Sequence, residues 1–256
     1  TKYLFLPSFI DMPTPEPSER GFYCPLVQSN AYMIRSALPV DESNLIDPTI
    51  YLKQDPDTLA IQLSEQIRKK LKVTKKKINR ALHYGLQKQR SFVESVYSSG
   101  MEILETLDPE EPLIVVTGRP YNLYDDRLNL RLGQNLSKIG VKALPMDFID
   151  TTSVSLKDFP SMYWGLGAQI LRTAKRIKEI PNHFGLHLTN FGCGADSFIE
   201  HFYKYIMGNK AYLILELDEH SAVAGVMTRL EAFKNVIDNS MMKSDTRREE
   251  PLKAVN

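Results

Sequence analysis

Hydrophobic and polar positions divide the chain into a helical middle and a second half in which short apolar runs alternate with helical patterns. The apolar runs predict four strands, at 113–117, 141–144, 184–188 and 212–217. The amphipathic stretches between and after them predict four helices, at 128–139, 163–177, 195–207 and 222–237. Strands alternating with helices of this length predict a parallel sheet with right-handed crossovers and flanking helices, a Rossmann-like α/β fold.

The middle of the chain has the pattern of a helical hairpin. Apolar residues recur at a spacing of four from Leu59 through Leu71, which predicts one amphipathic helix. Val73-Thr74 is a break, and Thr74 is suited to cap a second helix with its own apolar stripe. The hairpin carries a run of basic residues: Lys69, Lys70, Lys72, Lys75, Lys76, Lys77 and Arg80. This run is either a solvated helix face or a docking surface for an acidic partner.

The pattern of apolar and polar residues in the first 55 positions predicts part of a second α/β lobe. The run 3–6 is ended by Pro7 and predicts a buried strand, and the proline-rich residues 11–21 predict a loop. A helix is expected from Cys24 to about Leu38, because Pro39 disfavours helix in the residue before it. We therefore expect four segments: a partial lobe at 1–55, the hairpin at 56–110, the Rossmann-like lobe at 111–240, and a flexible tail at 241–256.

Composition narrows the class of protein. Lys+Arg 32 against Asp+Glu 31 gives a net charge of +1, so bulk charge favours neither nucleic acid nor an anionic membrane as a partner. No apolar run approaches the roughly 20 residues that span a bilayer. Two cysteines in 256 residues do not form a disulfide framework, which favours the cytoplasm. Because the chain begins at Thr1 and enters a strand almost at once, we expect it to be a fragment of a longer protein.

Both cysteines, Cys24 and Cys193, precede predicted helices. A helix N-terminus offers free N–H groups and the positive end of the helix dipole, which favour thiolate over thiol. Thiolate binds iron and zinc, so the position predicts metal or redox chemistry. Gly192 and Gly194 flank Cys193 and would let a bulky inorganic group approach the backbone.

Three loops with polar residues follow predicted strands, at 117–122, 190–194 and 218–221. Ligands of parallel α/β sheets bind at the carboxyl ends of the strands, so we expect the three loops to share one edge. Arg119, in the first loop, is suited either to a phosphate or carboxylate ligand or to a loop-pinning salt bridge. The acids considered as its partners are Asp125, Asp126 and Asp147.

The third loop, Asp218-Glu219-His220-Ser221, has two interpretations. It is a metal or acid–base cluster, in which case His220 and Glu219, with Arg119 of the first loop, are the candidate catalytic residues. Alternatively, Asp218 and Ser221 cap the helix that follows. A thiol hydrolase built from Cys193, His220 and one of the two acids is a further possibility. The sequence holds no Walker loop, no complete G-x-G-x-x-G and no C-x-x-C.

Several motifs resemble a known superfamily. Residues 190–198 resemble the cluster-ligand loop of the 2-hydroxyacyl-CoA dehydratase β-subunit superfamily, and 218–233 resemble its closing motif. Tyr23-Cys24-Pro25 is similar to its second cysteine motif. Gly118-Arg119-Pro120-Tyr121-Asn122 is similar to the branch of CoA-substrate-specific enzyme activases, in which ATPase activator modules are fused to a dehydratase-like part.

The resemblance implies that Cys24 and Cys193 are thiolate ligands of a low-potential [4Fe–4S] or double-cubane cluster. It implies electron delivery from an ATP-hydrolysing activator module, in the same chain or separate. It also implies an acyl-CoA substrate or reduction of a small molecule, and a possible homodimer. Family members use at least three cysteines per subunit, so a further ligand is expected upstream of Thr1. The alternative is a non-catalytic docking or regulatory module that grips its own ATPase part through the basic hairpin.

Overall fold

The computed structural model describes residues 3–249, with side chains described up to residue 242. The described residues form two compact units. One comprises the residues up to Ser95 together with Lys157–Ala168, and the other comprises Val96–Leu156 with the residues from Gln169 on. No helix in residues 3–249 combines the length and the apolar character needed to cross a membrane.

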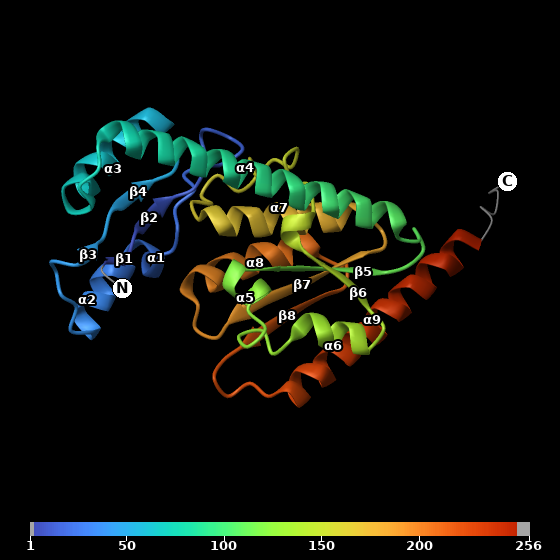
Figure 1. Cartoon of the computed structure of the whole chain (residues 1–256). Helices are drawn as coiled ribbons and strands as arrows, with labels where there is room; N and C mark the ends of the chain where they lie inside the picture. The colour runs from blue at the N-terminus through green and yellow to red at the C-terminus, as the bar shows by residue number, and fades with distance from the viewer. Residues whose placement is uncertain (1–2, 250–256) are drawn as a thin grey trace. The chain divides into compact units, whose positions relative to one another are not determined.

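The second unit is built on a parallel four-stranded sheet in the order β6-β5-β7-β8 (Figure 1). The strands are β5 Leu113–Gly118, β6 Lys142–Pro145, β7 His183–Asn190 and β8 Tyr212–Leu217. Six helices of the described chain belong to this unit wholly or in part: α4 Lys75–Thr106 from Val96 on, α5 Pro120–Tyr124, α6 Leu132–Lys138, α7 Gly165–Glu179, α8 Gly194–Met207 and α9 Val223–Glu249. Met146–Phe148 forms one 3₁₀ turn. The predicted α/β fold with a parallel sheet and flanking helices is therefore confirmed.

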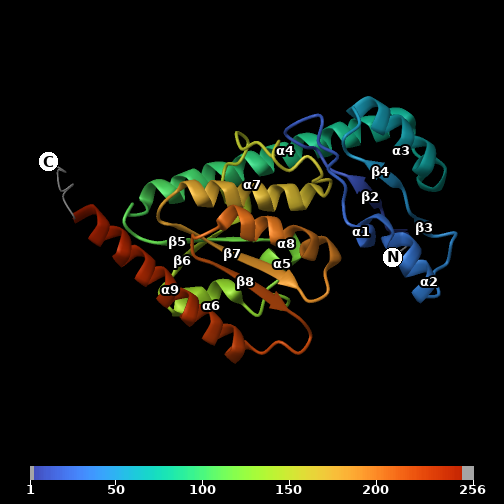
Figure 2. The same ribbon diagram turned by 180° about the vertical axis from the view of Figure 1, so that it is seen from behind.

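Helices cover both faces of this sheet (Figures 1 and 2). On one face, Leu186 and Leu188 of β7 pack with Leu132 of α6 and with Leu230 and Phe233 of α9. α7 and α8 cover the other face. All six residues of β5 are buried, as expected for a strand of a parallel sheet that has helices on both sides.

The first unit contains two pairs of short parallel strands. β1 Leu4–Phe5 pairs with β3 Leu45–Ile46, and β2 Ser8–Asp11 pairs with β4 Thr49–Tyr51. Its helices are α1 Pro25–Gln28, α2 Asn30–Ala37, α3 Pro56–Leu71 and α4 up to Ser95. Ile46, Ile67 and Ile78 form a small core between β3, α3 and α4.

The segment Lys157–Ala168 completes the first unit, although it lies far away in the sequence. The backbone N–H of Phe22 donates to the Tyr163 carbonyl at 2.8 Å, and Gly165 N–H donates back to Phe22 at 2.9 Å. Gly165 fits closely here, because a Cβ at this position would lie 2.5 Å from the Met12 side chain. This contact fixes where α7 begins.

Several predicted elements differ from the structure in detail. The N-terminal strand exists, but Leu4 and Phe5 are 42% and 54% exposed rather than buried. β2, β3 and α5 were not predicted, and the helix predicted at 128–139 spans only Leu132–Lys138. α9 continues to Glu249 instead of ending near Ile237. The division at 55, 110 and 240 stays a prediction, and the end of the predicted tail, from residue 250, lies outside the described residues.

Candidate functional site

The three loops singled out by sequence lie at one edge of the sheet, as predicted. Gly118 ends β5 opposite Leu188 of β7, and Asn190 ends β7 opposite Leu217 of β8. The strands are parallel neighbours, so the loops that follow them share the carboxyl edge. Two of these loops are tied directly, because the Asn122 side-chain amide donates to Asn190 Oδ1 at 2.5 Å.

Arg119 forms a buried ion pair with Asp196 of α8. Its Nε and Nη2 atoms both donate to Asp196 Oδ1, at 2.9 and 2.7 Å, and the two side chains are 3% and 1% exposed. Burial works against the charge of Arg119, but Asp196 outweighs it and raises the pKa of the guanidinium. The predicted acid partners Asp125, Asp126 and Asp147 were wrong, although a loop-pinning salt bridge is what the structure contains.

The second oxygen of Asp196 is also satisfied. Thr189 at the end of β7 donates its hydroxyl to Asp196 Oδ2 at 2.8 Å. The carboxylate therefore joins the loop after β5, the end of β7 and the first turn of α8. Sequence reasoning missed Asp196, although an acidic residue in the first turn of a predicted helix is a signal that can be read.

Cys193 is the N-cap residue of α8, which confirms its predicted position before a helix. Its side chain is half-buried. The predicted preference for thiolate is wrong for the protein alone: burial, and then the negative charge of Asp196, raise the pKa of the thiol above its ordinary value. Arg119 and the backbone N–H of Asp196 act in the opposite direction without overcoming these two effects.

The glycines around Cys193 leave open space. Gly192 adopts φ +73°, which accounts for glycine at that position. Gly194 is the first residue of α8 and does not have a left-handed backbone, and a Cβ on it would meet no atom within 4 Å. Glycine is costly in a helix, so the protein alone gives no reason for glycine at 194.

Cys24 likewise is an N-cap residue with a half-buried side chain. The helix that follows it, α1, has only four residues and breaks at Ser29 before α2. A helix this short develops little of the dipole on which the thiolate argument depends. The predicted position of Cys24 before a helix is confirmed.

The Asp218–Ser221 loop forms a local turn. Asp218 Oδ1 accepts hydrogen bonds from the backbone N–H of His220 at 3.0 Å and from the Ser221 hydroxyl at 2.9 Å. The Ser221 bond is the first cause of the lowered pKa of Asp218. The side chains of His220 and Glu219 are 84% and 82% exposed, and His220 Nε2 lies 3.7 Å from Glu219 Oε1. The arrangement supports a structural turn before α9.

A second buried polar cluster lies on the sheet face covered by α8. His187 Nδ1 is 3.1 Å from the Thr117 hydroxyl, and its ring stacks on Tyr203 with 5.2 Å between the ring centroids. Burial lowers the pKa of His187. His187 Nε2 and the Tyr203 hydroxyl are buried and have no hydrogen-bond partner in the described part of the chain. Sequence reasoning missed this cluster, because a histidine inside a buried strand looks like packing.

Two chemistries can be assessed from this geometry. Within residues 3–242, no three His, Cys, Asp or Glu side chains lie close enough together to hold a metal ion. The thiol hydrolase lacks support, because no hydrogen bond joins Cys193 to His220 in the described chain and the pKa of Cys193 is raised.

The fold and loops define a parallel α/β protein whose polar residues gather at the carboxyl edge of the sheet. Residues 1–149 match the model of a family described as the CoA enzyme activase uncharacterised domain, and the chain belongs to this family. This finding supports the activase part of the resemblance seen in the sequence. It does not extend to the dehydratase β-subunit.

No curated protein matches the chain. One solved structure, a manganese-bound mutant of a periplasmic metal-binding protein from Candidatus Liberibacter asiaticus, aligns with 14% identity. The alignment covers 84% of this chain and 77% of the other, with a TM-score of 0.24. A score this low carries no argument about fold or function.

Proposed function

We propose that this chain is the thiolate-bearing part of a CoA-enzyme-activase-type protein and that Cys193 ligates an iron–sulfur cluster. The observation that carries the proposal is the unexplained Gly194 beside a half-buried thiol. Because Gly194 lies beside this thiol, the space that it leaves free is room for an inorganic group bound to the sulfur. Iron–sulfur clusters are held by cysteine thiolates.

The surrounding residues fit this role. Gly192 and Gly194 leave room for an inorganic group on the backbone side of Cys193. The Arg119–Asp196 ion pair and the Thr189 hydrogen bond fix the first turn of α8, and with it the thiol. Binding must displace the thiol proton, and Arg119 is the nearby cation that favours the charged sulfur.

Bound at Cys193, a [4Fe–4S] or double-cubane cluster would supply low-potential one-electron transfer. The remaining ligands have to come from outside the immediate loop, and Cys24 is the other cysteine of the chain. The proposed electron donor is an ATP-hydrolysing activator module. The proposed acceptor is an acyl-CoA or another small molecule.

Iron and acid-labile sulfide in the full-length protein, purified without oxygen, test the proposal. We expect iron in the wild type, and its loss in Cys193→Ala. Cys24→Ala reports whether the second cysteine is a ligand. Absence of iron from the wild type, or unchanged iron in Cys193→Ala, would overturn the proposal.

The variant Gly194→Ala tests whether iron binding can be lost while the fold is kept. The added Cβ meets nothing in the protein, so the variant should fold normally and gain up to about 1 kcal/mol of stability. It should nevertheless bind much less iron. Gly133→Ala is the matched control, because Gly133 also lies in the first turn of a helix and its Cβ also meets open space. That variant should keep its iron.

A further inference from the structure

Helix α4 carries its charges in two separate blocks. All its basic residues precede residue 91, and all its acidic residues follow it. The basic block is Lys75, Lys76, Lys77, Arg80, Lys88 and Arg90, and the acidic block is Glu94, Glu102 and Glu105. The part of the basic run from Lys75 on is therefore one end of a bipolar helix.

This distribution is unfavourable within the helix itself. The first turn of α4 has no acidic residue and begins with three lysines, and the last turn has no basic residue. A helix dipole favours the reverse, negative charge at the N-terminus and positive charge at the C-terminus. An explanation for the pattern therefore has to lie outside the helix.

Four members of the two blocks are also unpaired within the residues that the structure describes. Lys77, Arg80, Glu102 and Glu105 are exposed, and none of them forms a hydrogen bond or an ion pair through its side chain in the part of the chain that the structure describes. At 3.6 residues per turn, these four positions lie within about 40° of Ser91 around the helix axis. They therefore share one face of α4 with Ser91.

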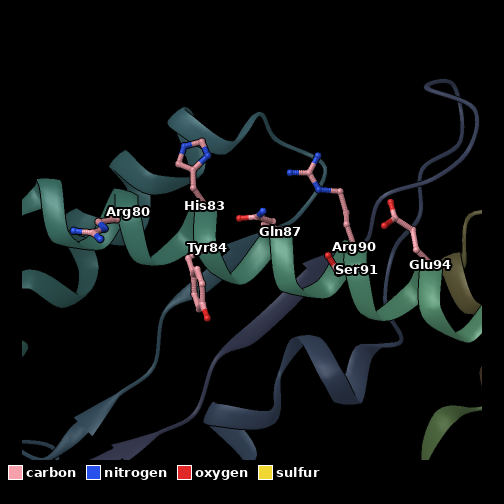
Figure 3. Close-up of a pocket in the computed structure, with 7 residues that line it drawn as sticks. All are labelled: Arg80, His83, Tyr84, Gln87, Arg90, Ser91 and Glu94. Atoms are coloured by element: carbon pink, nitrogen blue, oxygen red, sulfur yellow. The ribbon is translucent and has the colours of Figure 1, made fainter.

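That face bears a shallow groove of about 650 Å³, which Arg80, Tyr84, Gln87, Ser91 and Glu94 line together with His83 and Arg90. Figure 3 shows all seven side chains standing along the one helix. Small ligands need a site that encloses most of their surface, which a single helix does not provide. Tyr84 is 61% exposed in this groove. The face is suited to a partner helix.

We propose that α4 pairs antiparallel with α4 of a second copy of this chain, with the two-fold axis passing beside Ser91. Arg80 and Glu102 lie eleven residues before and after Ser91, and Lys77 and Glu105 lie fourteen before and after it. A two-fold rotation about an axis beside Ser91 therefore places Lys77 and Arg80 of one copy against Glu105 and Glu102 of the other. The arrangement is isologous, so each contact occurs twice.

The register also suits the groove. Tyr84 and Ser98 lie seven residues on either side of Ser91, so the tyrosine of one copy meets a serine of the other. Small side chains at Ser91 and Ser98 let the helices approach to the roughly 8–10 Å between axes that packed helices adopt. An antiparallel pair also opposes the two helix dipoles favourably.

Charge reversal tests the register. Lys77→Glu/Arg80→Glu and Glu102→Lys/Glu105→Lys should each weaken self-association at least about tenfold, because each places like charges in contact. Mixed in equal amounts, the two variants should form a heterodimer, because opposite charges then face each other in both halves. Lys69→Glu/Lys72→Glu is the matched control. It reverses two basic charges outside α4 and should leave self-association unchanged.

Sedimentation equilibrium of the full chain at low and high salt supplies the measurement. The wild-type dimer should weaken with salt, since exposed charges are screened beyond about 10 Å at 0.1 M. A monomeric wild type at low salt overturns the proposal, and so does a dimer that both charge reversals leave intact. If the two mixed variants do not form a heterodimer, the proposed register is also wrong. The partner of the basic block is then an acidic protein.

Cross-linking gives an independent readout. In this register only position 91 faces its own copy, so Ser91→Cys should form an intermolecular disulfide on mild oxidation. Ser98→Cys faces Tyr84 instead and should not, and the wild type with Cys24 and Cys193 controls for the native thiols. Equal cross-linking at 91 and 98 would contradict the pairing.

Discussion

The Arg119 and Asp196 side chains show how one buried ion pair organises the candidate site. Removing two charges from water is costly, and such a pair is tolerated when its remaining donors and acceptors are satisfied. Here Asp196 Oδ1 accepts two bonds from the guanidinium, and Oδ2 accepts one from Thr189. The pair thereby fixes the loop after β5 against the start of α8.

Truncation of Arg119 should be severe. Arg119→Ala leaves the Asp196 carboxylate buried without its counter-ion, so we expect a loss of about 3–5 kcal/mol in the free energy of unfolding. Urea unfolding followed by circular dichroism measures it. Arg127→Ala, at an exposed position of the neighbouring loop, should change stability by no more than about 0.5 kcal/mol. Similar losses in the two variants would show that the ion pair contributes little.

His183 at the start of β7 should make stability depend on pH. It is only 7% exposed, and burial, followed by the charges of Lys210 and Arg176, lowers its pKa to about 4. The unfolded chain, with a histidine pKa of about 6.5, binds this proton more readily than the folded one. The contribution of neutral His183 to the free energy of unfolding is therefore complete above a pH of about 6.5, and it is lost as the pH falls toward about 4.

His183→Gln removes this titration, so its stability should fall less than that of the wild type between pH of about 6.5 and about 4. The difference is at most about 3.5 kcal/mol, at about 1.4 kcal/mol per pKa unit. Chemical denaturation at a series of pH values measures it. His201→Gln, at an exposed position of α8, is the control. Parallel pH profiles for wild type and His183→Gln would refute the assignment.

At the scale of elements, Gly185 sets the distance between β7 and α8. A Cβ at this position would lie 2.2 Å from the Tyr203 hydroxyl and 3.3 Å from the ring carbon that bears it. Tyr203 is fully buried, and its hydroxyl has no hydrogen-bond partner of acceptable geometry within the described residues. The strand can approach the helix only because one residue lacks a side chain.

A double-mutant cycle tests this contact. Gly185→Ala should destabilise the protein by about 1–3 kcal/mol through overpacking. Tyr203→Phe should be neutral or stabilising, because it removes a buried hydroxyl without a partner. In the Tyr203→Phe background the cost of Gly185→Ala should fall sharply, since the atom that clashes is gone. Additive effects, measured by urea unfolding, would place the clash elsewhere.

Periodicity predicted the elements of the second half well, because buried strands such as β5 and amphipathic helices such as α7 have strong patterns. It missed β2, β3 and α5, which are two to five residues long and leave little pattern to read. It placed Cys193 and Arg119 at the correct edge of the sheet. It could not find Asp196 as the partner of Arg119, because that contact joins residues 77 positions apart through packing.

At the scale of the whole molecule, the path of the chain does not follow the span of the family model. The chain passes from the first unit to the second within α4, returns for Lys157–Ala168, and leaves again within α7. The first unit therefore depends on residues 157–168, which supply the bridge between Trp164 and Phe22. The second unit depends on β7, which pairs with both β5 and β8.

A fragment of residues 1–149, the span matched by the family model, should not fold on its own. It keeps β5 and β6 but lacks β7, so the edge of a fully buried strand becomes exposed, and exposed edges favour aggregation. It also lacks Tyr163, Trp164 and Gly165, which hydrogen-bond to and pack on the 12–22 loop. Both units lose part of their cores, because each is built from two separated stretches of sequence.

Thermal unfolding by circular dichroism and amide hydrogen exchange should show no cooperative transition in the fragment, whereas residues 1–249 should unfold cooperatively. A cooperative transition with protected β5 amides in the fragment would mean that the family span is a folding unit after all.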